Sequence, residues 1–283
     1  MKKSNLQFNR MSLLVTAGMF MSLMAYQPYA KSAQNDAATG QVLNIGSDMT
    51  FPPYEYLENG TPKGVDVQIM EKLAELNGAL KPNWIDTRWV NLIPGLKSGK
   101  FDVLYSSMYI TKERMAQIDM IPYLKTDISL LVLKDSKYQP KGPMDLCGRT
   151  VGAMKGTAFV AQVQSISKDR CEADGKKPIV IREFETSPQT TQAVLAHAVE
   201  VQYDDAAVMK AAVKSLPKRV EISSTESFFP VVSGIGVRKG DKKIYDLITS
   251  GLEKMKQSGD LKRILDEYGI QEPSAEDISR VMN

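Results

Sequence analysis

The chain has 283 residues, of which 43% are hydrophobic and 24% are charged, enough for one large domain or two ordinary ones. Its 36 basic and 33 acidic residues give a net charge of +3, and Lys2, Lys3 and Arg10 account for the whole excess. Because the remainder carries no basic surplus, its charge gives no electrostatic basis for binding nucleic acid.

The first thirty residues have the layout of a secretory signal peptide. The basic start is followed by the nearly uncharged apolar run 11–25, which is too short to span a bilayer comfortably, and by small residues around Ala30. No cysteine precedes Cys147, which argues against a lipid anchor. The sequence predicts a soluble periplasmic protein from which residues 1–30 are removed.

From residue 41 onward, short β-rich runs alternate with helical periods, a pattern typical of βαβ units and mainly parallel sheets. Apolar residues at every third or fourth position predict a helix over residues 65–76, which the pair Asn77-Gly78 would end. The other elements expected in this first series are strands at 42–46, 83–86 and 101–106, a short helix at 90–96, and a helix capped by Thr111.

A second series of similar elements follows the loop 134–143. It predicts strands at 150–154, 179–184 and 201–203, helices at 157–167, 188–199 and 206–214, and a strand-like segment at 229–238 that is interrupted by Ser-Gly. Two amphipathic helices around 244–255 and 261–268 then close the chain.

The two helices at the end of the chain have no neighbouring strands to pack on, and the strands of the first series have too few helices to cover them. The economical solution is an α/β fold with a discontinuous first lobe, residues 41–133 plus 232–283, and a second lobe at 136–229. Each lobe would be a mainly parallel sheet flanked by helices, with hinge crossings at 129–133 and 231–237. Since ligands of open α/β sheets bind at the carboxyl ends of strands, two facing lobes predict a closing cleft.

Cys147 and Cys171 are the two cysteines of the chain. An even number of cysteines in an exported protein favours a disulfide, which would close a loop of 24 residues and stabilise the fold by roughly 3 kcal/mol. A metal site built on the same thiols would lack further ligands, because the sole histidine, His197, is distant in sequence. We therefore expect one disulfide, no metal and no cofactor.

Several motifs, in this order and spacing, resemble the polar-amino-acid solute-binding proteins of ABC importers over residues 41–270. They are Phe51-Pro-Pro-Tyr-Glu-Tyr56, Gly64-Val-Asp66, the run 92–102, Ile110-Thr-Lys-Glu-Arg114, the run 145–152, Lys155-Gly-Thr157 and the run 236–241. No single motif is diagnostic, but the ordered set is specific. The resemblance implies a two-lobed periplasmic-binding-protein fold of type II, acting as a monomer that delivers its ligand to an inner-membrane permease.

The resemblance places Arg114 where the family clamps the α-carboxylate of the ligand. A guanidinium fork matches a carboxylate bidentately, and a cleft excludes the competing water. The alternative is a surface arginine paired with Glu113 or Asp119 on the same helix.

Asp205 matches the family's aspartate for the ligand α-ammonium, at a strand end in the second lobe. The alternative is an N-cap for the helix that begins at Ala206, a role that Asp204 could equally supply. Both roles are compatible in one residue.

Four more residues match ligand contacts of the family. Gly156 and Thr157 lie where a strand turns into a helix, and amides at a helix N-terminus favour an anion. Phe51 and Trp89 match aromatic positions that pack on the ligand side chain. The alternatives are an ordinary turn and cap for the first pair and lobe core for the second; Tyr54 and Tyr56 are expected in the lobe core or at the cleft rim.

Other positions depart from the family pattern or modify it. In the segment Ser106-Ser107-Met108-Tyr109, Ser107 keeps a small hydroxyl, whereas Tyr109 replaces a small residue that bonds the α-carboxylate. The tyrosine is expected to fill more of the pocket and carry its hydroxyl outward. Asp48 matches a position that reads cationic side chains, or organises its loop with Thr50, and Arg88 adds a second cationic contact.

These assignments predict capture by hinge closure, with Arg114 on one lobe and Asp205 on the other. Neither lobe alone satisfies a zwitterion, so the ligand would stabilise only the closed state. The protein is expected to bind rather than transform its ligand.

The main alternative is a periplasmic cyclohexadienyl dehydratase, acting on prephenate or arogenate, on the same scaffold. Such an enzyme needs a general acid in the cleft. Glu55, Glu183 and Glu200 are candidates, but no motif fixes one of them in the pocket. A further alternative is a binding protein that also reports its ligand to a membrane receptor.

Overall fold

A mixed sheet runs through the part of the chain that the structure describes. The computed structural model describes residues 40–78, 80–224 and 228–282. Within these residues, nine strands pair in the order β5-β1-β6-β12-β7-β10-β8-β9, with β11 added to β7. The predicted signal peptide, residues 1–30, lies outside the described residues.

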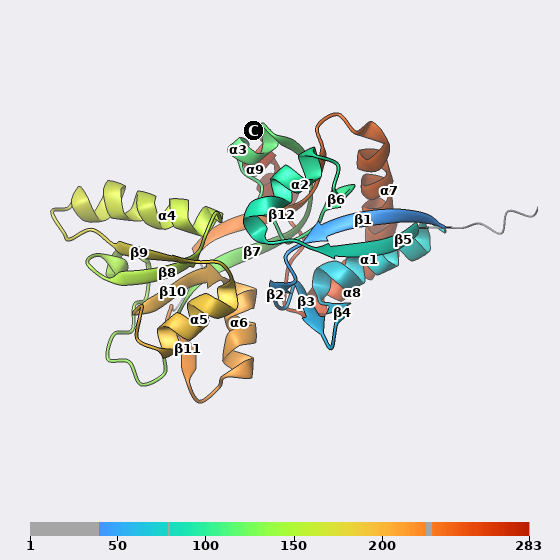
Figure 1. The fold of residues 1–283 in the computed structure, drawn as a ribbon. Helices are drawn as coiled ribbons and strands as arrows, with labels where there is room; N and C mark the ends of the chain where they lie inside the picture. Colours follow the sequence, from blue (N-terminus) through green and yellow to red (C-terminus); the bar gives the residue numbers. More distant parts are fainter. Residues whose placement is uncertain (1–39, 79, 225–227, 283) are drawn as a thin grey trace, which may run out of the picture. The chain divides into compact units, whose positions relative to one another are not determined.

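The sheet contains two parallel groups of strands joined by antiparallel ones (Figure 1). The first group is β1 (Gln41–Ser47), β5 (Leu80–Asp86) and β6 (Val103–Leu104). The second group is β8 (Thr150–Met154), β9 (Val180–Phe184) and β10 (Val201–Asp205). The antiparallel strands between them are β7 (Ile118–Leu133), β12 (Phe228–Arg238) and β11 (Val220–Ile222).

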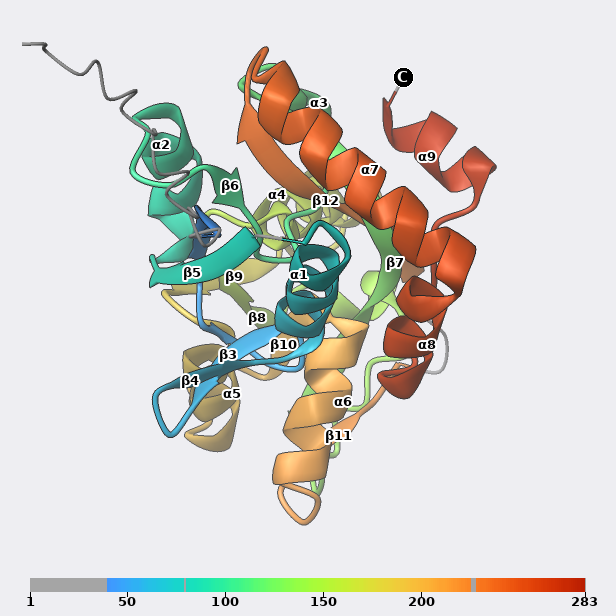
Figure 2. The same ribbon diagram turned by 90° about the vertical axis from the view of Figure 1, so that its right-hand side faces the viewer.

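Helices pack against both groups of strands (Figures 1 and 2). Those around the first group are α1 (Val65–Leu76), α2 (Leu92–Lys97), α3 (Lys112–Met115), α7 (Lys242–Ser258), α8 (Asp260–Glu267) and α9 (Ala275–Met282). Those around the second group are α4 (Ala158–Ile166), α5 (Ser187–Leu195) and α6 (Ala206–Ser215). α7 and α8, although late in the sequence, pack on α1. The architecture is the two-lobed α/β fold that the motif order implies.

Helix α1 confirms the helix predicted from periodicity. Val65, Ile69 and Leu73 are fully buried, and their spacing places them on one face of the helix. Gly78 follows with a φ of 71°, a left-handed conformation that glycine adopts without a steric penalty. The helix therefore begins and ends where its sequence predicts.

Other elements differ from the prediction. The strand expected at 101–106 is reduced to Val103–Leu104. The helix expected at 188–199 ends at Leu195, because the chain turns back through His197 with a φ of 57°. α4 continues into a π-helical turn, η3 (Ser167–Glu172), and 3-10 turns occur at η1 (Trp89–Asn91) and η2 (Pro143–Leu146).

Two further parts of the fold were not predicted. A small antiparallel sheet of β2 (Thr50–Phe51), β3 (Glu55–Glu58) and β4 (Thr61–Lys63) follows β1. β7 extends far beyond the predicted crossing 129–133, although it contains Pro122. Proline is tolerated in a strand at a bulge, and Pro122 pairs with Gly234 where the register of β12 shifts.

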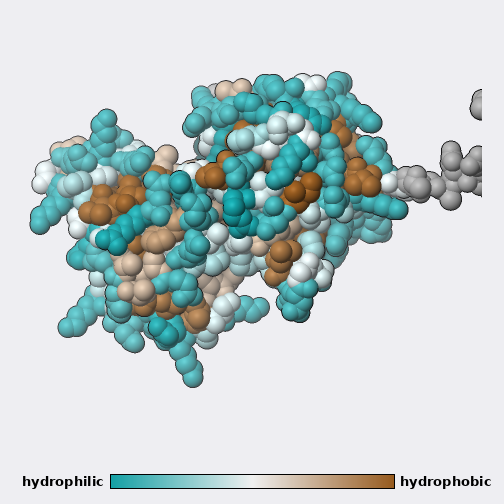
Figure 3. Space-filling model, viewed as in Figure 1, coloured by the Kyte–Doolittle hydropathy of each residue, from teal (hydrophilic) through white to brown (hydrophobic). Residues whose placement is uncertain are grey.

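The predicted disulfide between Cys147 and Cys171 is confirmed and ties η2 to η3. The exposed large hydrophobic side chains are scattered along the described chain, and Figure 3 shows separate brown patches on a largely hydrophilic face. None of the helices in the described ranges is both long enough and apolar enough to cross a membrane.

Candidate functional site

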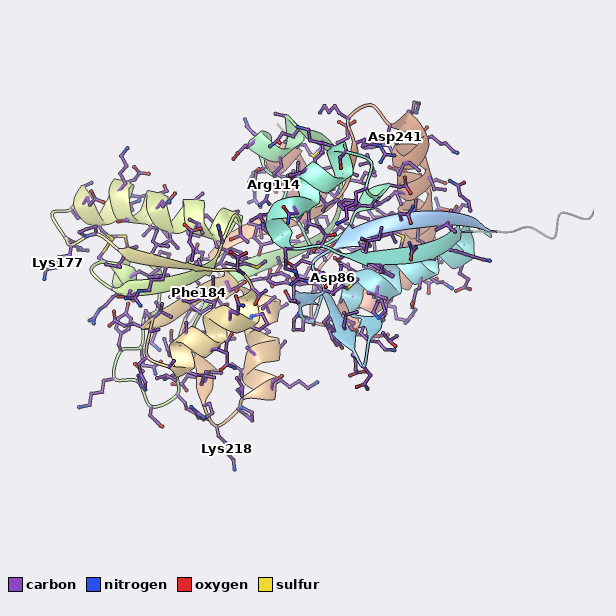
Figure 4. All side chains as sticks on the ribbon, in the orientation of Figure 1. Asp86, Arg114, Lys177, Phe184, Lys218 and Asp241 are labelled. Atoms are coloured by element: carbon purple, nitrogen blue, oxygen red, sulfur yellow. A yellow bond between two sulfur atoms is a disulfide. The ribbon has the colours of Figure 1, made fainter. Side chains whose placement is uncertain are left out.

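A narrow cavity of about 10 Å³, room for about one water molecule, lies where the two groups of parallel strands end. Its described lining consists of Phe51, Trp89, Ser107, Tyr109, Arg114, Met154, Thr157, Ala158 and Phe159. Met154, the last residue of β8, lines it, and Figure 4 shows Asp86, the last residue of β5, near the centre of the view with Phe184, the last residue of β9, to its left. The cavity is thus at the carboxyl ends of strands, the usual ligand position in open α/β sheets.

Arg114 is a buried cation without an acidic partner among the described residues. Its side chain is brought to the cavity by α3, which Thr111 caps by accepting a hydrogen bond from the Arg114 amide at 3.3 Å. The guanidinium donates to the Tyr109 carbonyl at 2.8 Å and lies 5.3 Å from the centre of the Trp89 ring. The residue is 9% exposed, and burial lowers the pKa of Arg114 to about 10, so it stays charged at neutral pH.

The alternative of a surface ion pair for Arg114 does not occur in the structure. Glu113 is its sequence neighbour but forms no ion pair with it in the described chain, and Asp119 pairs instead with Lys239 at 2.9 Å. A buried charge left without a counter-charge is costly. The site therefore favours a ligand that brings a negative charge to Arg114.

Aromatic rings form the walls of the cavity. Phe51 stacks on Tyr54 with 5.7 Å between ring centres. Phe159 meets Tyr109 edge-on at 5.5 Å. The Trp89 indole donates to the Gly156 carbonyl at 2.9 Å, which links the loop after β5 to the loop after β8. The walls are thus largely apolar, and charge is concentrated at Arg114.

The start of α4 supplies the opposite wall. Thr157 is the N-cap residue, but its hydroxyl donates back to the Met154 carbonyl rather than capping the helix. Gly156, with a φ of 71°, lies outside the cavity lining and contributes the carbonyl that Trp89 binds. The helix N-terminus thus faces the cavity through Thr157, Ala158 and Phe159.

Ser107 is held in place by a carboxyl that the sequence analysis did not single out. Its amide donates to Asp66 Oδ2 at 2.9 Å, and its hydroxyl lies 3.3 Å from that of Ser233. Asp66 is fully buried and also accepts a hydrogen bond from the Tyr123 hydroxyl at 2.7 Å. Asp66 belongs to the quoted motif Gly64-Val-Asp66, which was the available signal.

Asp48 and Arg88 pair with each other rather than line the cavity. Their ion pair measures 2.9 Å, and Arg88 also contacts Asp86. Asp48 accepts from the Trp89 amide and from the Thr50 hydroxyl, both at 2.8 Å. This geometry corresponds to the loop-organising alternative for Asp48, and the pair fixes the position of Trp89.

Asp205 is fully buried and is not part of the cavity lining. It caps α6 by accepting from the amides of Ala207 at 2.8 Å and Val208 at 3.3 Å. The Tyr54 hydroxyl donates to the same carboxylate at 3.0 Å and the Tyr109 hydroxyl at 2.7 Å. The expectation that Tyr109 carries its hydroxyl outward is therefore wrong: the phenol reaches across to Asp205.

The cavity thus brings together six of the ten predicted ligand contacts: Phe51, Trp89, Ser107, Tyr109, Arg114 and Thr157. The other four predicted contacts lie outside the cavity lining: Asp48, Arg88, Gly156 and Asp205. Met154, Ala158 and Phe159 were not anticipated, because backbone position alone brings these apolar side chains to the site.

Known proteins with similar sequences and structures bind solutes. The probable histidine-binding protein of Neisseria gonorrhoeae is 26% identical over 258 residues, covering 89% of this chain and 92% of that protein. An ancestral arginine-binding protein bound to arginine has 30% identity and a TM-score of 0.73, covering 82% of this chain and 99% of that one. The ancestral amino acid-binding protein AncCDT-1, a precursor of cyclohexadienyl dehydratase, has 26% identity and a TM-score of 0.70, with 80% and 95% covered. The model of the bacterial extracellular solute-binding proteins, family 3, matches residues 43–271, and the chain belongs to this family.

Proposed function

We propose that this protein is the substrate-binding component of an ABC importer and captures an amino acid or an amino-acid derivative. The observation that carries the proposal is Arg114, a buried cation that faces a small cavity and has no acidic partner in the described chain. A ligand carboxylate would complete this site with two parallel hydrogen bonds. Two similar proteins are named for binding histidine and arginine, and both of these solutes carry a carboxylate.

The proposed mechanism is closure around the ligand. Residues 41–133 plus 232–283 would move against 136–229, with hinges at 129–133 in β7 and 231–237 in β12. Arg114 belongs to the first lobe and the start of α4 to the second, so a ligand that contacts both stabilises the closed form. An inner-membrane permease would then receive the ligand from the closed, monomeric protein.

Export completes the proposal. The layout of residues 1–30 supports a cleaved signal peptide, and the absence of a cysteine before Cys147 supports a protein without a lipid anchor. The family's description as extracellular agrees with a periplasmic location.

Capture is favoured over turnover. A dehydratase needs a general acid that can reach its substrate. The nine described lining residues of the cavity include no carboxyl and no imidazole. Glu55 is buried behind the site against Ser106, and Glu200 pairs with Arg149 at 3.0 Å on the surface.

Thermal unfolding of the exported protein against a panel of amino acids, their derivatives and small carboxylates tests the proposal. A ligand that binds the native state raises the melting temperature with concentration. Arg114→Ala is expected to abolish that shift, whereas Arg219→Ala, which removes an exposed arginine outside the cavity, should leave it intact. An unchanged shift in Arg114→Ala, or no shift with any carboxylate, would contradict the proposal.

A further inference from the structure

The two oxygens of the buried Asp205 carboxylate have different partners. The Tyr54 hydroxyl and two backbone amides at the start of α6 donate to Oδ1, whereas Oδ2 receives the Tyr109 hydroxyl at 2.7 Å. Thr126 also contributes a side-chain hydrogen bond to this carboxylate. All of these donors are neutral. Since a charged donor bonds a carboxylate more strongly than a neutral one does, an ammonium can displace the phenol from Oδ2.

Tyr109 is bonded to both buried charges of the site. Its backbone carbonyl accepts from the Arg114 guanidinium at 2.8 Å, and its hydroxyl donates to Asp205. A buried charge without a counter-charge is costly, and a zwitterion would supply one to each of these residues. The two polar groups of Tyr109 therefore contact the charged groups to which the carboxylate and the ammonium of an amino acid would bind.

The two contacts of Tyr109 respond differently to a ligand. A guanidinium has several N–H donors, so Arg114 can bind a carboxylate and keep the Tyr109 carbonyl. Asp205 is fully buried and does not line the cavity, whereas Tyr109 does. The cavity has room for about one water molecule, so its walls must move apart to admit an amino acid. An ammonium reaches Oδ2 when the Tyr109 side chain turns aside, a movement that leaves the backbone carbonyl in place.

From this geometry we infer that Tyr109 is an internal competitor of the ligand: its hydroxyl holds Oδ2 of Asp205 until the α-ammonium of an amino acid displaces it, and returns when the ligand leaves. The inference rests on the proposed function, because it assumes that this cavity is the ligand site. The loss of the phenol hydrogen bond offsets part of what the ammonium gains. Tyr109 thus lowers the affinity for amino acids and accelerates their release.

Removal of the hydroxyl alone tests the competition. Tyr109→Phe keeps the ring and the carbonyl that binds Arg114. Calorimetric titrations would use the exported protein, freed of bound solute by unfolding and refolding, with L-histidine, L-arginine, L-glutamine, L-leucine and L-phenylalanine as probes. Those that bind the wild type should bind the variant about tenfold more tightly, because a hydrogen bond to a charged acceptor no longer has to be broken. Stopped-flow measurements should show slower dissociation.

Matched analogues separate competition with the ammonium from other effects of the substitution. Each amino acid is paired with the carboxylate in which hydrogen replaces the α-amino group. Such an analogue has no group to take the place of the phenol, so its affinity should be the same in Tyr109→Phe and the wild type. Tyr268→Phe is the matched control: it removes a hydroxyl that accepts from Gln68 at 2.6 Å outside the cavity, and it should leave all affinities unchanged.

Each outcome of the titrations decides a different statement. Equal or weaker binding of the amino acids by a folded Tyr109→Phe protein would overturn the inference and leave the proposed function standing. An equal gain for the analogues would also overturn it, because the hydroxyl would then oppose any ligand. If none of these amino acids binds the wild type, the inference falls. If no carboxylate of the wider panel binds either, the proposed function falls with it.

A measurement on the wild type decides the inference if Tyr109→Phe does not fold. The Tyr109 hydroxyl proton, held by a buried carboxylate, should be visible by NMR and identified through the ring of Phe159, whose centre lies 5.5 Å from that of Tyr109. The signal should be lost when a bound amino acid displaces the hydroxyl and should persist with the matched analogue. Its persistence with a bound amino acid would overturn the inference.

Discussion

Two buried carboxyl groups, those of Asp66 and Glu55, lie directly behind the cavity and hold in place the backbone that lines it. Asp66 accepts from the amide of Ser107, a non-glycine residue with a φ of 42°, and so holds an unfavourable backbone conformation in place. Burial raises the pKa of Asp66 to about 7. Burial and then the charge of Asp66 raise the pKa of Glu55 well above its usual range. Protonation of this pair therefore affects stability near neutral pH.

Glu55→Gln is expected to flatten the dependence of the unfolding free energy on pH. The unfolded chain loses these protons near pH 4, whereas the folded chain keeps them to higher pH, so stability is full below about pH 4 and falls toward about pH 7. One such proton contributes a slope of about 1.4 kcal/mol per pH unit, and glutamine, a neutral side chain of the same shape, removes it.

Urea unfolding at about pH 5, 6 and 7 measures this slope. Glu58→Gln, which replaces an exposed carboxyl three residues along the same strand, is the matched control and should retain the wild-type slope. The same slope in Glu55→Gln as in the wild type would contradict the assignment of the titration to the buried pair.

At the scale of elements, the disulfide stabilises the second group of strands without forming the site. Cys147 precedes β8 and Cys171 follows α4, and neither lines the cavity. Cys147→Ala combined with Cys171→Ala is expected to lower the unfolding free energy by about 2–4 kcal/mol. Without the disulfide, the loop between two cysteines 24 positions apart is free in the unfolded chain, whose conformational entropy rises. Urea unfolding measures the loss. Ligand affinity should stay within about twofold of the wild type, and unchanged stability would show the prediction to be wrong.

The elements also separate what a pattern can predict from what it cannot. Both ends of α1 were predicted to the residue, because the spacing of its buried apolar residues is visible within the helix's own sequence. The first part of β7 was missed because Pro122 argues against a strand, and the bulge that tolerates it depends on the partner strand β12. The small sheet β2-β3-β4 was missed because its strands have two to four residues, too few to show a period.

On the scale of the whole molecule, a hydrogen bond joins the loop after β5 to the loop after β8, beside the cavity. The Trp89 indole donates to the Gly156 carbonyl, and Gly156 precedes α4 of the second group. A net contribution of about 1 kcal/mol is typical of such a bond. The bond therefore favours the arrangement in which both walls meet a ligand.

Trp89→Phe is expected to weaken ligand affinity about three- to tenfold, because it removes the indole donor and keeps an aromatic ring beside Arg114. Small-angle scattering should show ligand-induced compaction of the wild type and, at the same ligand concentration, less compaction of the variant. Trp84→Phe is the matched control: Trp84 packs on Tyr105 away from the cavity and should have no effect on affinity. Equal affinity in Trp89→Phe and the wild type would contradict the proposed role of the bond.

The sequence by itself determined the fold class, the disulfide, the family and six of the residues that meet at the cavity. Periodicity and cysteine number can be read from the chain alone, and the ordered motifs supplied the resemblance from which the family and these six residues were inferred. Only the tertiary structure decided which groups donate hydrogen bonds to Asp205. Tyr54, Tyr109 and Asp205 are separated by 55 to 151 positions in the numbering, and their hydroxyls and carboxylate meet only when the two groups of strands face each other. A motif can place an aspartate where an ammonium would bind, but only packing shows that two phenols already bind it.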